Sequence, residues 1–175
     1  MTAAAQTTAA PSHHYWLRIG LMTVAALELM DAVASLGHVS VGPGQADALM
    51  RTAQLLLTVK LALAPVAAGA ALLFAALGWL RAAVLSLAAF ALMGWGLVDV
   101  WTLVNYGLGF RPDSYYGPLD ALAHQVVFPL GALAGAVMAL TTRHLAWAGL
   151  FASLPPLFNW VHVLLFAASI LLSGV

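Results

Sequence analysis

Residues 55–77 read LLLTVKLALAPVAAGAALLFAAL, and Lys60 is the single charged side chain among them. A bilayer has a hydrocarbon core about 30 Å thick, which a helix of about 20 apolar residues crosses at about 1.5 Å per residue. The stretch is long enough and apolar enough to cross that core. It therefore predicts a transmembrane helix.

Four further segments share this character and are separated by short polar or Gly-, Pro- and Tyr-containing connections. They are Leu17–Leu36, Ala82–Val104, Leu122–Thr141 and Leu145–Leu172. The sequence thus predicts an all-α integral membrane protein, a bundle of about five transmembrane helices in one domain over residues 17–175. Residues 1–16 are expected to form a disordered cytoplasmic tail. Pro155-Pro156 predicts a kink in the last helix, because proline removes backbone hydrogen bonds.

The composition agrees with this class. Hydrophobic residues make up 63% of the chain and charged residues 7%, whereas soluble domains carry about 25% charged residues. The formal net charge is zero, so no basic surface for nucleic acid is expected. The chain has no cysteine, which excludes thiolate ligands and a cysteine nucleophile. The expected partners are the lipid bilayer and either other membrane subunits or further copies of this chain.

The arginines predict the orientation of the bundle. With five spans, Arg18, Arg81 and Arg143 fall on one side of the membrane, and Arg51 and Arg111 fall on the other. Lysine and arginine are enriched in cytoplasmic connections. The count of three against two favours a cytoplasmic N-terminus and a periplasmic C-terminus in the inner membrane.

The two halves of the chain, about 17–79 and 80–142, align with each other at an offset near 63 residues. The Leu-Arg pair at residue 17 recurs at residue 80, and Pro65 recurs as Pro129 one residue out of register. The alignment predicts a tandem repeat of a two-helix hairpin, followed by a fifth helix. The alternative is that two Ala- and Leu-rich sequences align through composition alone.

Small residues in the fourth segment predict a close helix contact. Gly131-x-x-x-Gly135 places two glycines on one face of that helix. Glycine has no side chain to hold a neighbouring helix away, so such pairs favour close approach in membranes. The pattern is common by chance in Ala- and Gly-rich spans.

Ionisable groups inside the spans indicate a polar site. Glu28, Asp31, Ser35 and His38 are spaced by three, four and three residues, which places them on one helix face. Lys60 on the second helix falls at a similar depth to Asp31, and the two are predicted to form an ion pair because a buried charge needs a partner. The complete predicted cluster of polar groups within the membrane is Glu28, Asp31, Lys60, Asp99 and Asn159.

The histidines are expected to lie at one depth. His124 precedes residue 143 by nineteen positions and His162 follows it by nineteen, so on antiparallel neighbouring helices their rings should approach each other. His38 and Asp99 are expected near the same end of the bundle. His38, His124 and His162 are the candidate metal or haem ligands.

Three functions remain open on this basis. The first, which we take as the leading hypothesis, is a haem- or metal-holding redox or accessory subunit, because imidazoles in helical bundles ligate haem iron and transition metals. The second is a proton-coupled transporter or a binding protein for a lipid-soluble small molecule, with Glu28 and Asp31 as proton-exchanging groups. The third is an accessory subunit whose polar groups only fix helix packing. No catalytic sequence motif indicates an enzyme class.

Overall fold

The apolar segments form long helices that are interrupted at only a few positions. The computed structural model describes residues 13–36, 48–109, 117–141 and 144–173. In chain order the helices are α1 (His13–Leu36), α2 (Ala48–Ala76), α3 (Leu80–Gly94), η1 (Trp95–Asp99), α4 (Val100–Tyr106), α5 (Pro118–Leu122), η2 (Ala123–Val127), α6 (Phe128–Thr141), α7 (Leu145–Ala152) and α8 (Leu154–Ser173). η1 and η2 are single π-helical turns inside longer helices.

Five helices in the described part of the chain are long and apolar enough to cross a membrane, as the sequence predicts. They are His14–Leu36, Arg51–Ala76, Leu80–Tyr106, Pro118–Thr141 and Leu154–Ser173. The first helix already begins at His13, so the end of the predicted tail is helical. The rest of that tail, residues 1–12, lies outside the described residues.

The predicted fifth segment is divided into two helices. α7 ends at Ala152 and α8 begins at Leu154. Pro155 and Pro156 lie in the first turn of α8, where a missing N–H costs no hydrogen bond within the helix. The two prolines therefore start a new helix in a new direction, which goes beyond the predicted kink.

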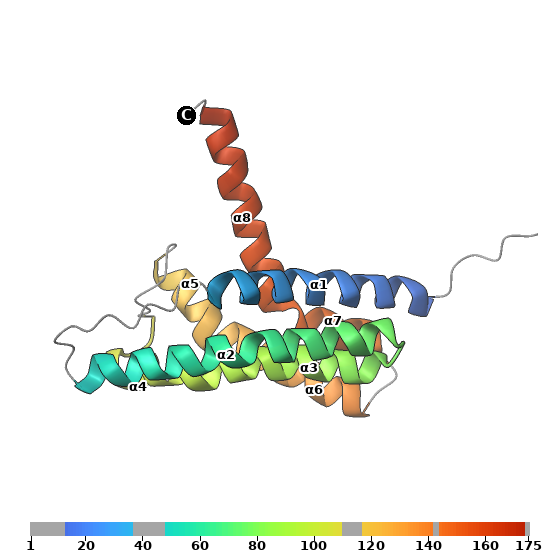
Figure 1. Ribbon diagram of the computed structural model, residues 1–175, viewed down its shortest axis with the longest axis horizontal. Coiled ribbons are helices and arrows are strands. Elements are labelled where there is room, and N and C mark those ends of the chain that lie inside the picture. Colours follow the sequence, from blue (N-terminus) through green and yellow to red (C-terminus); the bar gives the residue numbers. More distant parts are fainter. Residues whose placement is uncertain (1–12, 37–47, 110–116, 142–143, 174–175) are drawn as a thin grey trace, which may run out of the picture.

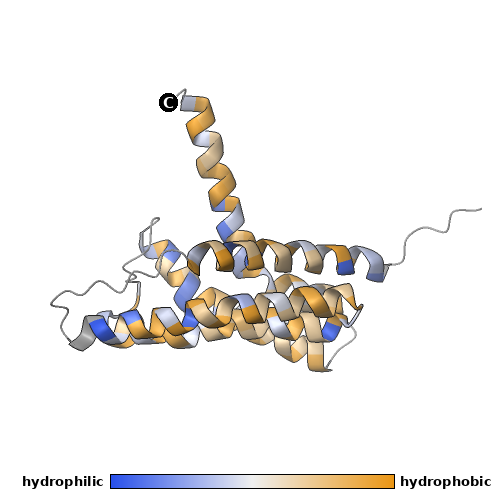
Figure 2. Ribbon diagram, viewed as in Figure 1, coloured by the Kyte–Doolittle hydropathy of each residue, from blue (hydrophilic) through white to orange (hydrophobic). Residues whose placement is uncertain are grey.

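Four long helices lie side by side, and α8 leaves them (Figure 1). α1, α2, the α3–η1–α4 helix and α6 run roughly along the long axis, while α7 packs against α6 and α3. α8 stands away from this bundle almost at right angles to it, with its C-terminal end far from the other helices. Most residues of the helices, including those of α8, are apolar (Figure 2).

The connection between α2 and α3 shows why these two helices are antiparallel. Gly78 adopts φ +79°, a left-handed conformation that glycine tolerates best. The Trp79 N–H donates to the Phe74 carbonyl at 2.8 Å, and the Gly78 N–H donates to the Ala75 carbonyl at 3.0 Å. These two bonds form a Schellman motif, which ends α2 and reverses the chain.

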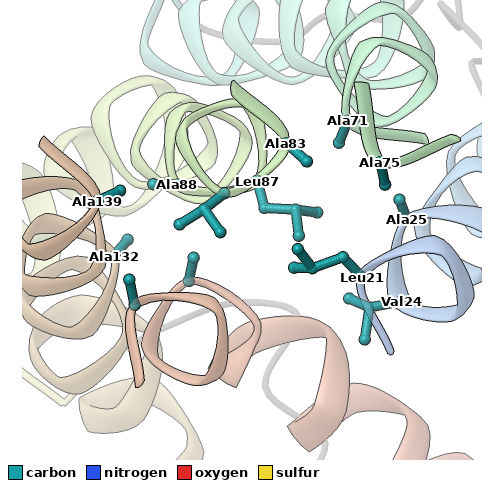
Figure 3. Close-up of a cluster of buried hydrophobic side chains, with 13 residues drawn as sticks. Leu21, Val24, Ala25, Ala71, Ala75, Ala83, Leu87, Ala88, Ala132 and Ala139 are labelled. Atoms are coloured by element: carbon teal, nitrogen blue, oxygen red, sulfur yellow. The ribbon is translucent and has the colours of Figure 1, made fainter. Parts of the chain in front are cut away.

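The interior of the bundle is made mainly of alanine. Buried residues of this core include Ala25, Ala71, Ala75, Ala83, Ala88, Ala132, Ala139, Ala148 and Ala152, joined by Leu21, Val24, Val84 and Leu87 (Figure 3). Larger apolar side chains such as Leu73, Leu133 and Leu164 are exposed. Small residues inside and large apolar residues outside are the arrangement expected of helices that pack closely in lipid.

α6 and α7 approach closely at the predicted glycine pair. A Cβ atom on Gly135 would lie 2.8 Å from the Ala148 carbonyl oxygen and 3.0 Å from the Ala152 nitrogen. A Cβ atom on Gly131 would lie 2.8 Å from a methyl carbon of Leu154 in α8 and 3.4 Å from the Phe151 carbonyl oxygen in α7. The backbones of α6 and α7 therefore meet at Gly135, and the prediction of close contact is confirmed.

We expect Gly135→Ala to lower the free energy of unfolding by about 1–3 kcal/mol, because the added methyl group meets backbone atoms that cannot turn aside. Gly69→Ala is the matched control, since nothing lies within 4 Å of a Cβ at Gly69 in α2. It should leave stability unchanged or raise it by up to about 1 kcal/mol. Denaturant unfolding of the purified protein in detergent measures both. Equal losses in the two variants would contradict the close contact.

Candidate functional site

A cavity of about 160 Å³ lies between the helices and is lined by residues from α1, α2, α3, η1, η2, α6 and α8. Its polar lining is Glu28, Asp31, Ser35, Lys60, Asp99, His124 and Asn159. Every member of the polar cluster that the sequence predicts is therefore part of one cavity, together with one of the predicted histidines. What these residues do there is a separate question.

Glu28 is the buried acid that α1 contributes to the cavity. Its side chain lines the cavity and is only 5% exposed. Its charge interacts with those of Asp31 and Lys60. Within the described residues, Glu28 makes no hydrogen bond and no ion pair. A buried carboxyl group without a partner is costly, which indicates that something else satisfies it.

Lys60 crosses from α2 towards α3 over a glycine. Its Cε atom lies 3.4 Å from the position that a Cβ on Gly94 would take, an ordinary van der Waals distance, so the lysine stem packs beside this glycine. Asp31, on α1, is exposed but lines the same cavity. The two residues thus meet at one cavity, while their ion pair stays a prediction.

Two π-helical turns face each other at the cavity. η1 carries Asp99, which is 5% exposed, and η2 carries His124. The Trp95 Nε1–H group donates to the Gln125 carbonyl at 2.9 Å and so ties one π turn to the other. The Gln125 Oε1 atom in turn accepts a hydrogen bond from the Gly109 N–H at 2.8 Å. A π turn inserts one residue into a helix and is frequent at functional sites.

His124 is held in a fixed orientation. Its Nδ1 atom lies 3.0 Å from the Asp120 carbonyl oxygen and 3.3 Å from the Asp120 Oδ1 atom. Since both partners are acceptors, Nδ1 carries the hydrogen. The predicted fourth helix begins at Leu122, after Asp120, so this pair was missed. The spacing of four residues between Asp120 and His124 could have revealed it, because residues four apart are neighbours on a helix.

His162 approaches His124 but does not line the cavity. The Phe158 ring lies 4.1 Å from the His162 ring and 6.1 Å from the His124 ring, centroid to centroid. The two imidazoles are therefore at most about 10 Å apart, as their equal separation from residue 143 predicts. His38 lies outside the described residues. Among the residues that the structure describes, no three His, Cys, Asp or Glu side chains are placed to hold one metal ion.

Comparison with known proteins adds no family to this description. The sequence matches no protein-family model, no curated protein and no solved structure. The function has to be inferred from the cavity itself.

The cavity lining has more acidic than basic side chains. Glu28, Asp31 and Asp99 supply three carboxyl groups, whereas Lys60 supplies one ammonium group. His124 adds a positive charge only when protonated, and Asp120 already lies beside it. With all carboxyl groups ionised, the lining would carry an excess of negative charge. Protons or a cationic ligand would balance it.

Proposed function

We propose that this chain is an integral membrane protein that binds a small solute in a cavity inside the bilayer and exchanges a proton at Glu28. This is the proton-coupled transporter or binding protein of the sequence analysis. One observation carries it: Glu28, buried and without a partner among the described residues, faces a cavity shared with two further acids and one lysine. Carboxyl groups at membrane depth are rare and mark proton relays and substrate pathways.

Membrane insertion is supported by the five apolar helices and by the large exposed apolar side chains around them. We place the protein in the inner membrane with a cytoplasmic N-terminus and a periplasmic C-terminus, on the arginine count alone. The cavity then lies in the outer half of the bilayer. The tandem hairpin origin, residues 17–79 and 80–142, also stays a proposal that rests on the sequence alignment.

The haem or metal hypothesis receives less support from the geometry. His124 and His162 are neighbours, but only His124 lines the cavity, and the described residues offer no set of three ligands. Phe158 contacts both imidazole rings. The acids, in contrast, gather in the cavity as a group. We therefore favour proton and solute binding over a redox cofactor.

Labelling with dicyclohexylcarbodiimide tests the proposal, because this apolar reagent modifies protonated carboxyl groups in apolar surroundings. We expect modification of Glu28 in the membrane-embedded protein, which mass spectrometry of peptides would locate. Labelling should fall as the pH rises, since the reagent needs the protonated form.

Two comparisons sharpen this experiment. Glu28→Gln should remove the labelled site without adding a new one. Asp120 is equally buried, at 7% exposure, but lies beside His124 and should label weakly or not at all. Absence of label from Glu28 at every pH, or labelling of Glu28 that does not depend on pH, would contradict the proposal.

A further inference from the structure

The cavity has an aromatic lining as well as an acidic one. Phe90, Trp95 and Phe128 line it from α3, η1 and α6. Phe128 is held in place by edge-on contacts with the rings of His124 and Phe158, at 4.8 and 5.2 Å. Trp95 is fixed by its hydrogen bond to the Gln125 carbonyl. Phe128 and Trp95 are therefore held in place by these contacts.

The cavity volume limits the size of a ligand. It is about 160 Å³, close to an apolar protein cavity of about 150 Å³ that accommodates benzene. A ligand of about six non-hydrogen atoms would fill a space of this size.

We infer that the cavity binds a small organic cation, an ammonium or alkylammonium ion, with Glu28 as its counter-ion and the aromatic rings as its apolar wall. The inference rests on the proposed solute site and names its ligand class. Carboxylate attracts the positive charge, and aromatic faces attract cations through their quadrupole while also contacting alkyl groups. The buried, unpartnered carboxyl of Glu28 is the group that such a cation would satisfy.

Other ligand classes fit this lining less well. An anion would meet three carboxyl groups and a single lysine. A metal ion would require a set of three close ligands, which the described residues do not provide. A neutral molecule would fill the space without balancing the charge of the carboxyl groups. Lys60 supplies one positive charge against three carboxyl groups, so an added cation would still meet a net negative lining when these groups are ionised.

Thermal unfolding in detergent tests the inference with tetramethylammonium chloride as the probe. Ligand that binds only the folded state raises Tm in a concentration-dependent way. We expect tetramethylammonium to raise Tm by several degrees and the effect to saturate. tert-Butanol has the same number of non-hydrogen atoms without the charge, and sodium chloride controls for ionic strength. Neither should reproduce the rise.

Two pairs of variants locate the effect. Glu28→Gln should abolish the tetramethylammonium shift, whereas Arg81→Gln, at an exposed charge far from the lining, should keep it. Phe90→Leu should weaken the shift, whereas Phe151→Leu, an aromatic residue outside the lining, should not. An equal Tm rise with sodium chloride or tert-butanol, or an undiminished shift in Glu28→Gln, would overturn the inference.

The outcomes separate this inference from the proposed function. If Glu28 reacts with the carbodiimide but tetramethylammonium neither raises Tm nor slows the labelling, the organic cation is wrong and proton exchange stands. If tetramethylammonium stabilises the wild-type protein while Glu28 never labels, cation binding stands and proton exchange is wrong.

Discussion

Replacing Lys60 by methionine is expected to lower the free energy of unfolding by about 1–3 kcal/mol, because the half-buried lysine is removed from beside three carboxyl groups. Methionine keeps an unbranched stem of similar length, so packing over Gly94 is preserved while the charge is lost. The carboxyl groups of Glu28, Asp31 and Asp99 would then share one cavity without their lysine. Denaturant unfolding in detergent measures this change in the free energy of unfolding.

Double variants identify the acid that Lys60 compensates. The sequence predicts Asp31, so adding Asp31→Asn to Lys60→Met should restore most of the lost stability. Asp99→Asn and Glu28→Gln are the parallel tests at the other two acids. Coupling between neighbouring charges shows as non-additive free energies. Arg81→Met serves as the control for removing an exposed cation and should change stability by no more than about 0.5 kcal/mol.

Two results would count against this role of Lys60. One is a Lys60→Met variant that unfolds with the same free energy as the Arg81→Met control. The other is strict additivity with all three acids, which would mean that the lysine charge is compensated elsewhere.

Deleting Gly96 is expected to weaken tetramethylammonium binding while leaving the protein helical. Gly96 lies within the π-helical turn η1, which holds one residue more than an α-helical turn. Removing one residue lets the turn close as α-helix, with Asp99 three residues after Trp95 instead of four. Trp95 and Asp99 both line the cavity and could then no longer keep their present positions relative to each other. The Tm shift reports binding, and circular dichroism reports helix content.

Gly96→Ala provides the matched control for the deletion. Gly96 is exposed, and nothing lies within 4 Å of a Cβ at this position, so alanine adds no clash and keeps the residue count. This variant should bind tetramethylammonium like the wild-type protein. If the deletion variant also shows the wild-type shift, the π turn does not position Asp99 for binding.

The five polar residues named from their spacing along the chain line one cavity. Glu28 and Asp31 are three residues apart, so one helix face carries both, with Glu28 buried and Asp31 exposed. Lys60 could be matched to them in depth because all helices rise by the same distance per residue. His124 and His162 lie on either side of Phe158, but equal rise along antiparallel helices does not account for this, because α8 leaves the bundle almost at right angles.

Features that depend on helix register or on direction after a break escaped prediction. A π turn shifts the register by one residue without changing hydropathy, so the setting of Asp99 beside η2 could not be predicted. The course of α8 was missed because prolines indicate where a helix starts but not where it points. Asp120 was assigned to the connection before the fourth helix, which begins at Pro118 and therefore includes it.

The alanine core also reduces the side-chain conformational entropy that the chain loses when it folds. Alanine has no side-chain rotamers, so its burial costs no side-chain conformational entropy, whereas leucine loses about 0.5–1 kcal/mol. Only a few core members, such as Leu21 and Leu87, have rotamers to lose. The helices therefore fit together through the shape of their backbones, with little side-chain freedom to adjust. A bundle of this kind is expected to select its helix pairs by the complementarity of their backbone surfaces.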